Sequence, residues 1–386
     1  MKLHFALPSA LAICFSLNCQ AAQPAAEQCV LDLEAIPAYL LENDPGAKDH
    51  LAQLGQMHFD NAYATAKEAA LVVPDATACL PVLNQYLSAW RKGHLQVTDV
   101  PAKSLAQAAA STSNAPSPPI DETYKPTLRV LSRKTVLLTL NSFRLSNHAL
   151  LVDLMKRNHR TLASHPNWII DVRRNDGGAD SSYEPLLPWL LADESINVGG
   201  EWLATPENIK ATERVCPLFY GGDDTCTKFA RETVEKMRAV EAGHYVPQRV
   251  GGSIDYVRYL PLERHRPTRV AVLIDNPCGS SCEQFLLSIR QSYSVKLLGR
   301  RTYGALDYSN VRPHDLPSGQ RILWYATSHS MRIPNLPVDA VGVLPDIYLP
   351  PPKDDRSRAE EIVQVHRWLE GGSLEPQPAV VASKLQ

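Results

Sequence analysis

The chain has 386 residues, of which 44% are hydrophobic and 21% are charged, and its formal net charge is −2. A chain of this length and balance can bury one large core or two domains, and it lacks the excess charge that would favour nucleic acid or an anionic membrane surface. Its 30 prolines favour a fold with many loops over a helical bundle.

The first 21 residues have the layout of a signal peptide. Lys2 precedes an apolar stretch over residues 5–17, small residues follow, and Ala21 is the expected cleavage position. The apolar stretch is shorter than the roughly 18 residues that a membrane span needs, and no later segment reaches that length. We therefore expect an exported protein, periplasmic or secreted, without a membrane span. A lipid anchor at Cys19 is the weaker alternative, because the residue before it is not small.

Removal of this leader would leave six cysteines, an even number that favours disulfides in an exported protein. Many pairings are possible, and the simplest joins cysteines that are close in the sequence: Cys29–Cys79, Cys216–Cys226 and Cys278–Cys282. The last pair is only four residues apart, which is near the limit of disulfide geometry on a regular helix. It becomes feasible if Cys278 lies in the turn before the helix.

Residues 22–99 are predicted to form a helical N-terminal domain, because their apolar residues recur at three- and four-residue spacings. The last helical segment, LPVLNQYLSAWRKG, ends with the stop signal Gly93, and His94 follows directly. Residues 100–126 are rich in Ala, Ser and Pro without an apolar period, which indicates a linker.

From residue 127 onward, short apolar runs alternate with amphipathic segments. The predicted strands are TVLLTL, NWIIDVR, TRVAVLID, VKLLG and RILWYATSHSMRI. This alternation predicts an α/β core with a covered sheet over residues 127–350. An insertion near 198–265, with a helix at TCTKFARETVEKMRAVEAG, would form a lid or a wall beside the substrate. Residues 351–386 are predicted to hold one helix and a polar tail.

Four segments of the core occur in the order IIDVRRNDGG, VAVLIDNPCGSSCEQF, LLGRRTYGALD and DAVGVLPDIYL. Together they resemble the C-terminal processing, or tail-specific, serine peptidases and their tricorn relatives. The pattern of that family is DLRxNxGG, a strand ending in a Ser-x-Ser-x-x-Glu-like turn, GExTxGK and GxxPDI. Each segment alone is weakly specific, whereas the four in this order are strongly specific. The resemblance covers about residues 127–350.

The resemblance implies a ββα-spiral core of the kind shared with crotonase-like and Clp-type enzymes. It also implies a serine peptidase that acts on a peptide or protein substrate through an acyl-enzyme, without a cofactor. The nucleophile of the family stands three residues before a glutamate that enters a helix. Here that glutamate is Glu283, so Ser280 is the expected nucleophile rather than Ser281.

A turn into a helix also leaves N–H groups free to stabilise an oxyanion. We expect the N–H of Ser281 to be one donor and an N–H of the Gly177–Gly178 turn to be the other. Taken without the companion segments, a serine directly before a helix is ordinarily interpreted as an N-cap.

The general base departs from the family pattern, because Ala305 stands where the processing peptidases carry the lysine of GExTxGK. Tricorn-type relatives use a histidine from upstream of the core, and His94 in KGHLQV resembles their DGH element. A catalytic histidine needs an acceptor at its second ring nitrogen. Asp339 lies where the relatives carry an acidic residue, and Asp307 is the alternative.

The missing lysine leaves a second function open, a catalytically inactive carrier of a ligand or peptide on the same fold, as in retinoid-binding relatives. No C-x-x-C pair or H-E-x-x-H motif occurs, so neither a metal site nor metal catalysis is expected. The gap between GHLQV and the core is too short for a PDZ domain, so capture of a substrate C-terminus is not implied. The oligomeric state is left open by these patterns.

Overall fold

The structure, a computed structural model, describes residues 24–100, 122–191, 194–220, 224–249 and 255–371. The predicted signal peptide and most of the predicted linker lie outside the described residues. Within the described ranges, no helix combines the length and the apolar character that crossing a membrane requires.

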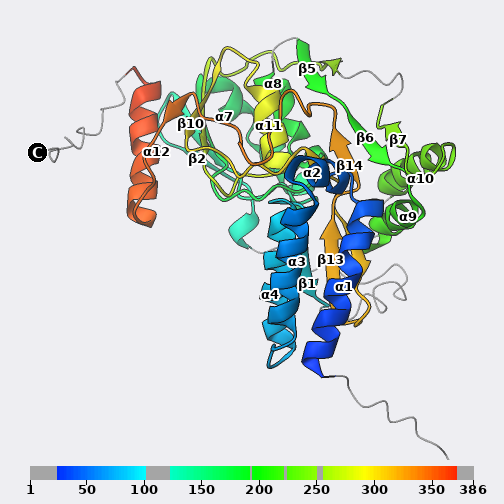
Figure 1. Cartoon of the computed structure of the whole chain (residues 1–386). Coiled ribbons are helices and arrows are strands. Elements are labelled where there is room, and N and C mark those ends of the chain that lie inside the picture. The colour runs from blue at the N-terminus through cyan, green and yellow to red at the C-terminus, as the bar shows by residue number, and fades with distance from the viewer. Residues whose placement is uncertain (1–23, 101–121, 192–193, 221–223, 250–254, 372–386) are drawn as a thin grey trace, which may run out of the picture.

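Residues 24–90 form four helices, of which α1, α3 and α4 pack together around one apolar cluster (Figure 1). Their bounds are α1 (Ala25–Asn43), α2 (Ala47–Leu54), α3 (Gln56–Ala70) and α4 (Ala76–Trp90). The helical character predicted for this part of the chain is confirmed. Gly55, with a positive φ of 82°, separates α2 from α3.

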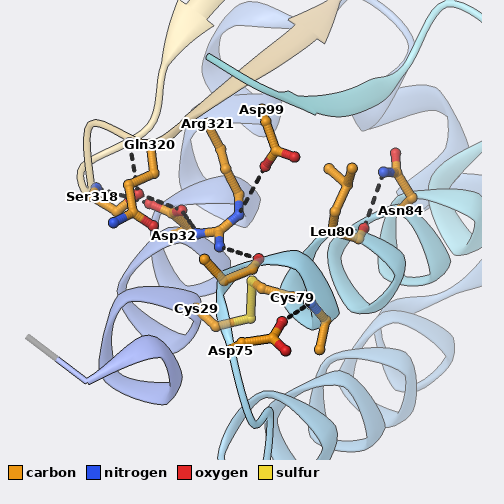
Figure 2. Close-up of a disulfide and its surroundings, with 12 residues drawn as sticks. Cys29, Asp32, Asp75, Cys79, Leu80, Asn84, Asp99, Ser318, Gln320 and Arg321 are labelled. Atoms are coloured by element: carbon orange, nitrogen blue, oxygen red, sulfur yellow. Dashed lines mark hydrogen bonds and ion pairs between the residues drawn. A yellow bond between two sulfur atoms is a disulfide. The ribbon is translucent and has the colours of Figure 1, made fainter. Parts of the chain in front are cut away.

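The predicted Cys29–Cys79 disulfide joins α1 to α4 and lies beside a buried ion pair (Figure 2). Asp32 of α1 is fully buried and accepts hydrogen bonds from the N–H and the hydroxyl of Ser318, at 2.9 and 2.8 Å. Arg321, also fully buried, donates to the same carboxylate at 2.9 Å and to the carbonyl of Ala76 at 2.7 Å. The N-terminal helices are therefore bonded to a hairpin far along the chain.

That hairpin also pairs with the strand that follows α4. Strand β1 (Gln96–Asp99) runs antiparallel to β13 (Arg321–Tyr325), and β13 in turn pairs with β12 (Arg312–Asp315). The short segment between α4 and β1, which contains His94, is therefore fixed at both of its ends.

The core is a six-stranded sheet in the order β15-β10-β9-β4-β3-β2, in which only the β2–β3 pair is antiparallel. Its strands are β2 (Thr127–Val130), β3 (Thr135–Thr139), β4 (Asn167–Asp171), β9 (Arg269–Ile274), β10 (Val295–Gly299) and β15 (Ile347–Tyr348). The predicted α/β core is confirmed, since the runs TVLLTL, NWIIDVR, TRVAVLID and VKLLG form β3, β4, β9 and β10. Nearly every side chain of these four strands is buried, which is why their sequences are apolar throughout.

Helices cover both faces of this sheet. On one face, α12 (Asp355–Leu369) packs Val365 and Leu369 against Ile169 and Leu273 (Figure 1). The larger apolar cluster, on the other face of the sheet, is formed with four helices. These four helices are α6 (Ser146–Arg157), α7 (His159–Ser164), α8 (Leu187–Leu190) and α11 (Ser281–Ile289). The described residues also form three short 3₁₀ helices: η1 (Glu122–Tyr124), η2 (Asp180–Ser182) and η3 (Glu184–Leu186).

The run RILWYATSHSMRI does not add a fifth strand to the core sheet, because its two halves pair with different partners. β13 pairs with β1 and β12, whereas β14 (Ser328–Ser330) belongs to the sheet β11-β14-β6-β7. The predicted insertion holds two helices instead of one, and the Cys216–Cys226 disulfide joins them. The remaining elements are β5 (Glu194–Val198), β6 (Gly200–Leu203), α9 (Pro206–Tyr220), α10 (Asp224–Arg238), β7 (Tyr245–Pro247), β8 (Asp255–Tyr259) and β11 (Tyr308–Ser309).

Candidate active site

Ser280 lies in the turn between β9 and α11, directly before the first residue of the helix. Its φ of 56° and ψ of −123° form a combination that favours glycine, and holding a serine there costs about 1–3 kcal/mol. The predicted Cys278–Cys282 disulfide is present and closes across the turn, with the two Cα atoms 5.5 Å apart. A strained strand-to-helix turn is a setting in which hydrolases expose a nucleophile.

A buried carboxylate connects this turn to the next loop. Glu283 accepts hydrogen bonds from the backbone N–H groups of Ser280 at 3.2 Å, Gly304 at 2.7 Å and Ala305 at 2.9 Å, and from the Thr302 hydroxyl at 2.5 Å. Burial raises the pKa of Glu283, and the four hydrogen bonds oppose that rise by favouring the charged form. The sequence pattern used Glu283 only to find the nucleophile, and its hold on residues 302–305 was not foreseen.

The glycine turn after β4 lies against the nucleophile turn. A Cβ on Gly177 would be 2.8 Å from the Cβ of Ser280, and a Cβ on Gly178 would be 2.2 Å from the carbonyl oxygen of Phe143. Both positions therefore require glycine, which also suits their φ values of 94° and 142°. The hydroxyl of Ser281 donates to the carbonyl of Gly178 at 2.9 Å and so joins the two turns.

The predicted oxyanion donors differ in their availability. The N–H of Gly177 donates to the side-chain oxygen of Asn175 at 2.9 Å. Within the described parts of the chain, the N–H groups of Gly178 and Ser281 have no acceptor. Of the predicted donors, the N–H groups of Gly178 and Ser281 are therefore the ones not already engaged among the described hydrogen bonds.

The segment that carries His94 packs on the same loop that Glu283 holds. A Cβ on Gly93 would be only 2.4 Å from the Cβ of Ala305, so the backbone of Gly93 occupies the space next to the alanine methyl group. The carbonyl of Ala305 in turn accepts the N–H of Ser280 at 3.0 Å. Ala305 is therefore in contact with both the histidine segment and the nucleophile turn, and a long side chain at this position would meet Gly93.

The ring of His94 is oriented by a backbone carbonyl. Its Nδ1 lies 2.5 Å from the carbonyl oxygen of Tyr308, and since a carbonyl only accepts, Nδ1 carries the hydrogen and leaves Nε2 with its lone pair. Loss of hydration, reinforced by the nearby Arg91, lowers the pKa of His94 to about 4, although the Tyr308 carbonyl opposes this. The ring is neutral at neutral pH. Among the described contacts, no hydrogen bond joins His94 to Ser280.

A buried ion pair holds the backbone of His94, whose φ of 50° is left-handed. Arg91 donates to both carboxylate oxygens of Asp44 at 2.5 and 2.6 Å, and its guanidinium also donates to the carbonyl of His94 at 3.1 Å. The hydroxyl of Tyr308 donates to Asp49 at 3.1 Å and so ties the same region to α2. Asp44 and Arg91 were not predicted, because no local pattern joins two residues 47 positions apart.

Asp339 and Asp307 bind backbone groups rather than the histidine. Oδ1 of Asp339 accepts from the N–H groups of Leu306 and Asp307 at 2.5 and 2.6 Å, and Oδ2 of Asp307 accepts from the N–H of Asp339 at 2.7 Å. Burial raises the pKa of both carboxyls. Within the described residues neither carboxylate has a hydrogen bond to His94. Asp339 reaches the ring indirectly, through the backbone of residues 306–308, whose Tyr308 carbonyl binds Nδ1.

Comparisons with known proteins place this geometry in a wider group. The model of peptidase family S41 matches residues 134–349, which is more than half of the chain. This range includes the candidate residues from Ser280 to Asp339, but it does not include His94. Mature CPAF has a similar structure, with a TM-score of 0.60, 12% identity, and coverage of 91% of this chain and 99% of that chain. A putative peptidase from Parabacteroides merdae has a TM-score of 0.53 and 13% identity, over 87% of this chain and 96% of its own. At such identities the likeness concerns the fold alone. No curated protein matches the sequence.

Proposed function

This chain belongs to peptidase family S41, a family of serine peptidases, and we propose that it hydrolyses peptide bonds through an acyl-enzyme on Ser280 with His94 as the general base. The observation that carries the proposal is the position of Ala305. This residue binds the nucleophile turn through its carbonyl, and its methyl group packs on Gly93, directly before His94. The histidine segment thus fills the space that a lysine base would need.

In the proposed acylation step, Nε2 of His94 accepts the proton of the Ser280 hydroxyl while Oγ attacks the scissile carbonyl carbon of a bound peptide. The carbonyl oxygen takes up the electron pair and receives hydrogen bonds from the N–H groups of Gly178 and Ser281. The imidazolium then returns its proton to the leaving amine, and a water molecule repeats the sequence to release the acid.

The low pKa of His94 fits a base that is uncharged before substrate arrives. Because burial disfavours its charged form, the imidazolium would be stabilised mainly by the oxyanion that develops at the same time. Hydrogen bonds between base and nucleophile often form only in the substrate complex, so their absence without substrate does not argue against this pair.

We assign Asp339 as the third member, acting indirectly. Its bonds to Leu306 and Asp307 hold the segment that ends at Tyr308, whose carbonyl sets the tautomer of His94. Asp339 is therefore a positioning residue in this proposal, and Asp307 supports it through the reciprocal bond.

We further propose that the protein is exported to the periplasm or secreted. The supporting observations are the signal-peptide layout of residues 1–21 and the disulfides at Cys29–Cys79, Cys216–Cys226 and Cys278–Cys282. Determination of the N-terminus of the protein recovered from the periplasm or medium tests this, and a product that retains Met1 in the cytoplasm would contradict it.

The catalytic proposal is tested with a fluorophosphonate probe and a mixed peptide library. We expect the probe to form one adduct, mapped by mass spectrometry to Ser280, and we expect Ser280→Ala to lose both labelling and cleavage. Ser288→Ala is the matched control for labelling, because its hydroxyl bonds, among the described contacts, only to the Gln284 carbonyl within α11. Cleavage that persists in Ser280→Ala would refute the assignment. A folded wild-type protein that neither reacts with the probe nor cleaves any peptide would support the inactive binding protein instead.

A further inference from the structure

A largely buried cluster of charges lies where three neighbouring strands of the core sheet end, each strand end being a few residues before a segment of the proposed active site. It comprises three arginines and three carboxylates, so its formal charges cancel, which is what makes their burial tolerable. Its members are Asp171, Arg173, Asp275, Arg300, Arg358 and Glu361. None of them belongs to the proposed catalytic machinery, and two of them come from α12, which follows the segment matched by the family model.

Glu361 of α12 bridges two strand ends. Its Oε2 lies 2.5 Å from a guanidinium nitrogen of Arg173, just after β4, and its Oε1 lies 2.5 Å from a guanidinium nitrogen of Arg300, just after β10. Arg173 is held in turn by both carboxylate oxygens of Asp171, at 2.6 and 2.8 Å. Since β9 lies between β4 and β10 in the sheet, the Glu361 carboxylate spans the strand that leads to the nucleophile.

The middle strand is bonded to the same helix. Asp275, directly after β9, accepts a hydrogen bond from Arg358 of α12 at 2.9 Å and from the N–H of Arg174 at 3.1 Å. Its own carbonyl accepts the N–H of Cys278, which begins the nucleophile turn. One face of α12 thus contacts the ends of all three strands.

Each of these strand ends leads within a few residues to a different part of the proposed site. Arg173 precedes the Gly177–Gly178 turn, Asp275 precedes Ser280, and Arg300 precedes Ala305. We propose that Glu361 is a positioning residue of the peptidase, which fixes the oxyanion turn and the 302–305 loop relative to each other. This inference rests on the proposed function, because it assigns a role to Glu361 in that reaction.

The expected consequence is a loss of rate rather than of binding. Misplacement of reacting groups by about 1 Å can lower a rate by about 10²-fold, while contacts with the rest of a substrate persist. We therefore expect Glu361→Gln in the full chain, which keeps the shape of the side chain but removes its charge, to lower kcat about tenfold or more with little change in KM. The rate of labelling of Ser280 by the fluorophosphonate should fall by a similar factor, because that reaction uses the same nucleophile and oxyanion donors.

The matched control is Glu360→Gln, the same substitution one position earlier on the helix. Glu360 is exposed and pairs only with Arg356, within its own helix, among the described contacts. Each rate is divided by the amount of Ser280 that the probe labels when its reaction has gone to completion. Unfolded protein is therefore left out of the enzyme concentration. If Glu361→Gln fails to fold, Arg358→Gln replaces it, because the Arg358 side chain is only partly buried, and we expect the same loss of kcat on a smaller scale.

The outcomes separate the two proposals. A Glu361→Gln protein that melts earlier but keeps the kcat and the labelling rate of the wild type would show that α12 is only a structural anchor, and would overturn the inference alone. Wild-type protein that is not labelled at Ser280 would overturn the proposed function first. Partial recovery of kcat in Glu361→Asp, which restores the charge on a shorter side chain, would support the positioning role.

Discussion

The nucleophile turn and the histidine segment meet at Ala305 but are held in opposite ways. The turn is closed by Cys278–Cys282 and capped by Glu283, two restraints from residues within three positions of Ser280, in addition to its bonds to Ala305 and Gly178. The ring of His94 is held by Tyr308, and its carbonyl by Arg91, which Asp44 fixes in turn; Tyr308 and Asp44 are both far from His94 in the sequence. The nucleophile turn therefore has covalent and capping restraints of its own, whereas the position of the histidine segment depends on the N-terminal helices packing correctly on the core.

The difference in restraints predicts how each half of the proposed site responds when one of its restraints is removed. Damage to a local restraint should misplace the nucleophile in a protein whose N-terminal helices remain packed. Damage to a distant restraint should release the base and weaken the contact between the two parts of the molecule together. The following four experiments separate these cases, from the largest expected effect to the smallest.

Replacement of the proposed base should have the largest effect. We expect His94→Ala to lower kcat about 10³-fold or more, because proton transfer from Ser280 is lost while the oxyanion donors remain. Michaelis–Menten kinetics on a cleaved peptide measure this, with His366→Ala on the surface of α12 as the control that should keep full activity. A His94→Ala enzyme with near-normal kcat would place the base elsewhere.

The distant restraint is tested at the Arg91–Asp44 pair. Arg91→Met leaves the Asp44 carboxylate buried without its partner, so we expect a loss of about 3–5 kcal/mol in the free energy of unfolding, measured by denaturant titration. We also expect kcat to fall about 10²-fold, because the His94 carbonyl loses its donor.

The double variant Asp44→Leu/Arg91→Met sharpens this test. It removes the unpaired charge and should recover much of the stability, since uncharged pairs often replace buried ion pairs without loss. Activity should stay low, because the carbonyl of His94 still lacks its donor. Recovery of both properties together would mean that Arg91 acts only through stability.

The local restraint is tested by removing the disulfide at the nucleophile. We expect Cys278→Ala/Cys282→Ala to lower kcat about tenfold, because Ser280 can then relax from its strained backbone conformation. The control is Cys216→Ala/Cys226→Ala, which removes a disulfide from the α9–α10 insertion. Equal kcat values for the two variants would show that the Glu283 bonds alone hold the turn.

The pH dependence should be the subtlest result. Because the neutral form of His94 is the active one, we expect kcat/KM to fall only as the pH drops through the folded pKa of about 4, and to be level from there to neutrality. The unfolded histidine titrates near its ordinary value of 6.5, so the unfolded state binds more protons between these values. His94 therefore contributes stability above about pH 6.5 that is lost as the pH falls towards 4. An inflection of kcat/KM at 6.5 would contradict a buried, uncharged base.

Several features were predictable because their causes are local. The apolar runs of β3, β4, β9 and β10 follow from strands buried on both faces, and the three disulfides join cysteines that were the nearest available in the chain. The split of RILWYATSHSMRI between two sheets was not predictable, since an apolar run is the same whichever strand it pairs with. The hydrogen bond that occupies the Gly177 N–H was equally hidden, because it depends on the rotamer of Asn175.

The sequence by itself determined the α/β core, the strand-to-helix turn at Ser280 and the replacement of the family lysine by Ala305. All of these depend on apolar periodicity, on turn chemistry or on residues within a few positions of one another. Only the tertiary structure decided that the Gly93–His94 segment packs on Ala305, that the Tyr308 carbonyl orients the ring, and that Glu361 bridges Arg173 and Arg300. Each of these contacts joins segments far apart in the chain, and their meeting is set by how whole helices and strands pack, which no short stretch of sequence contains.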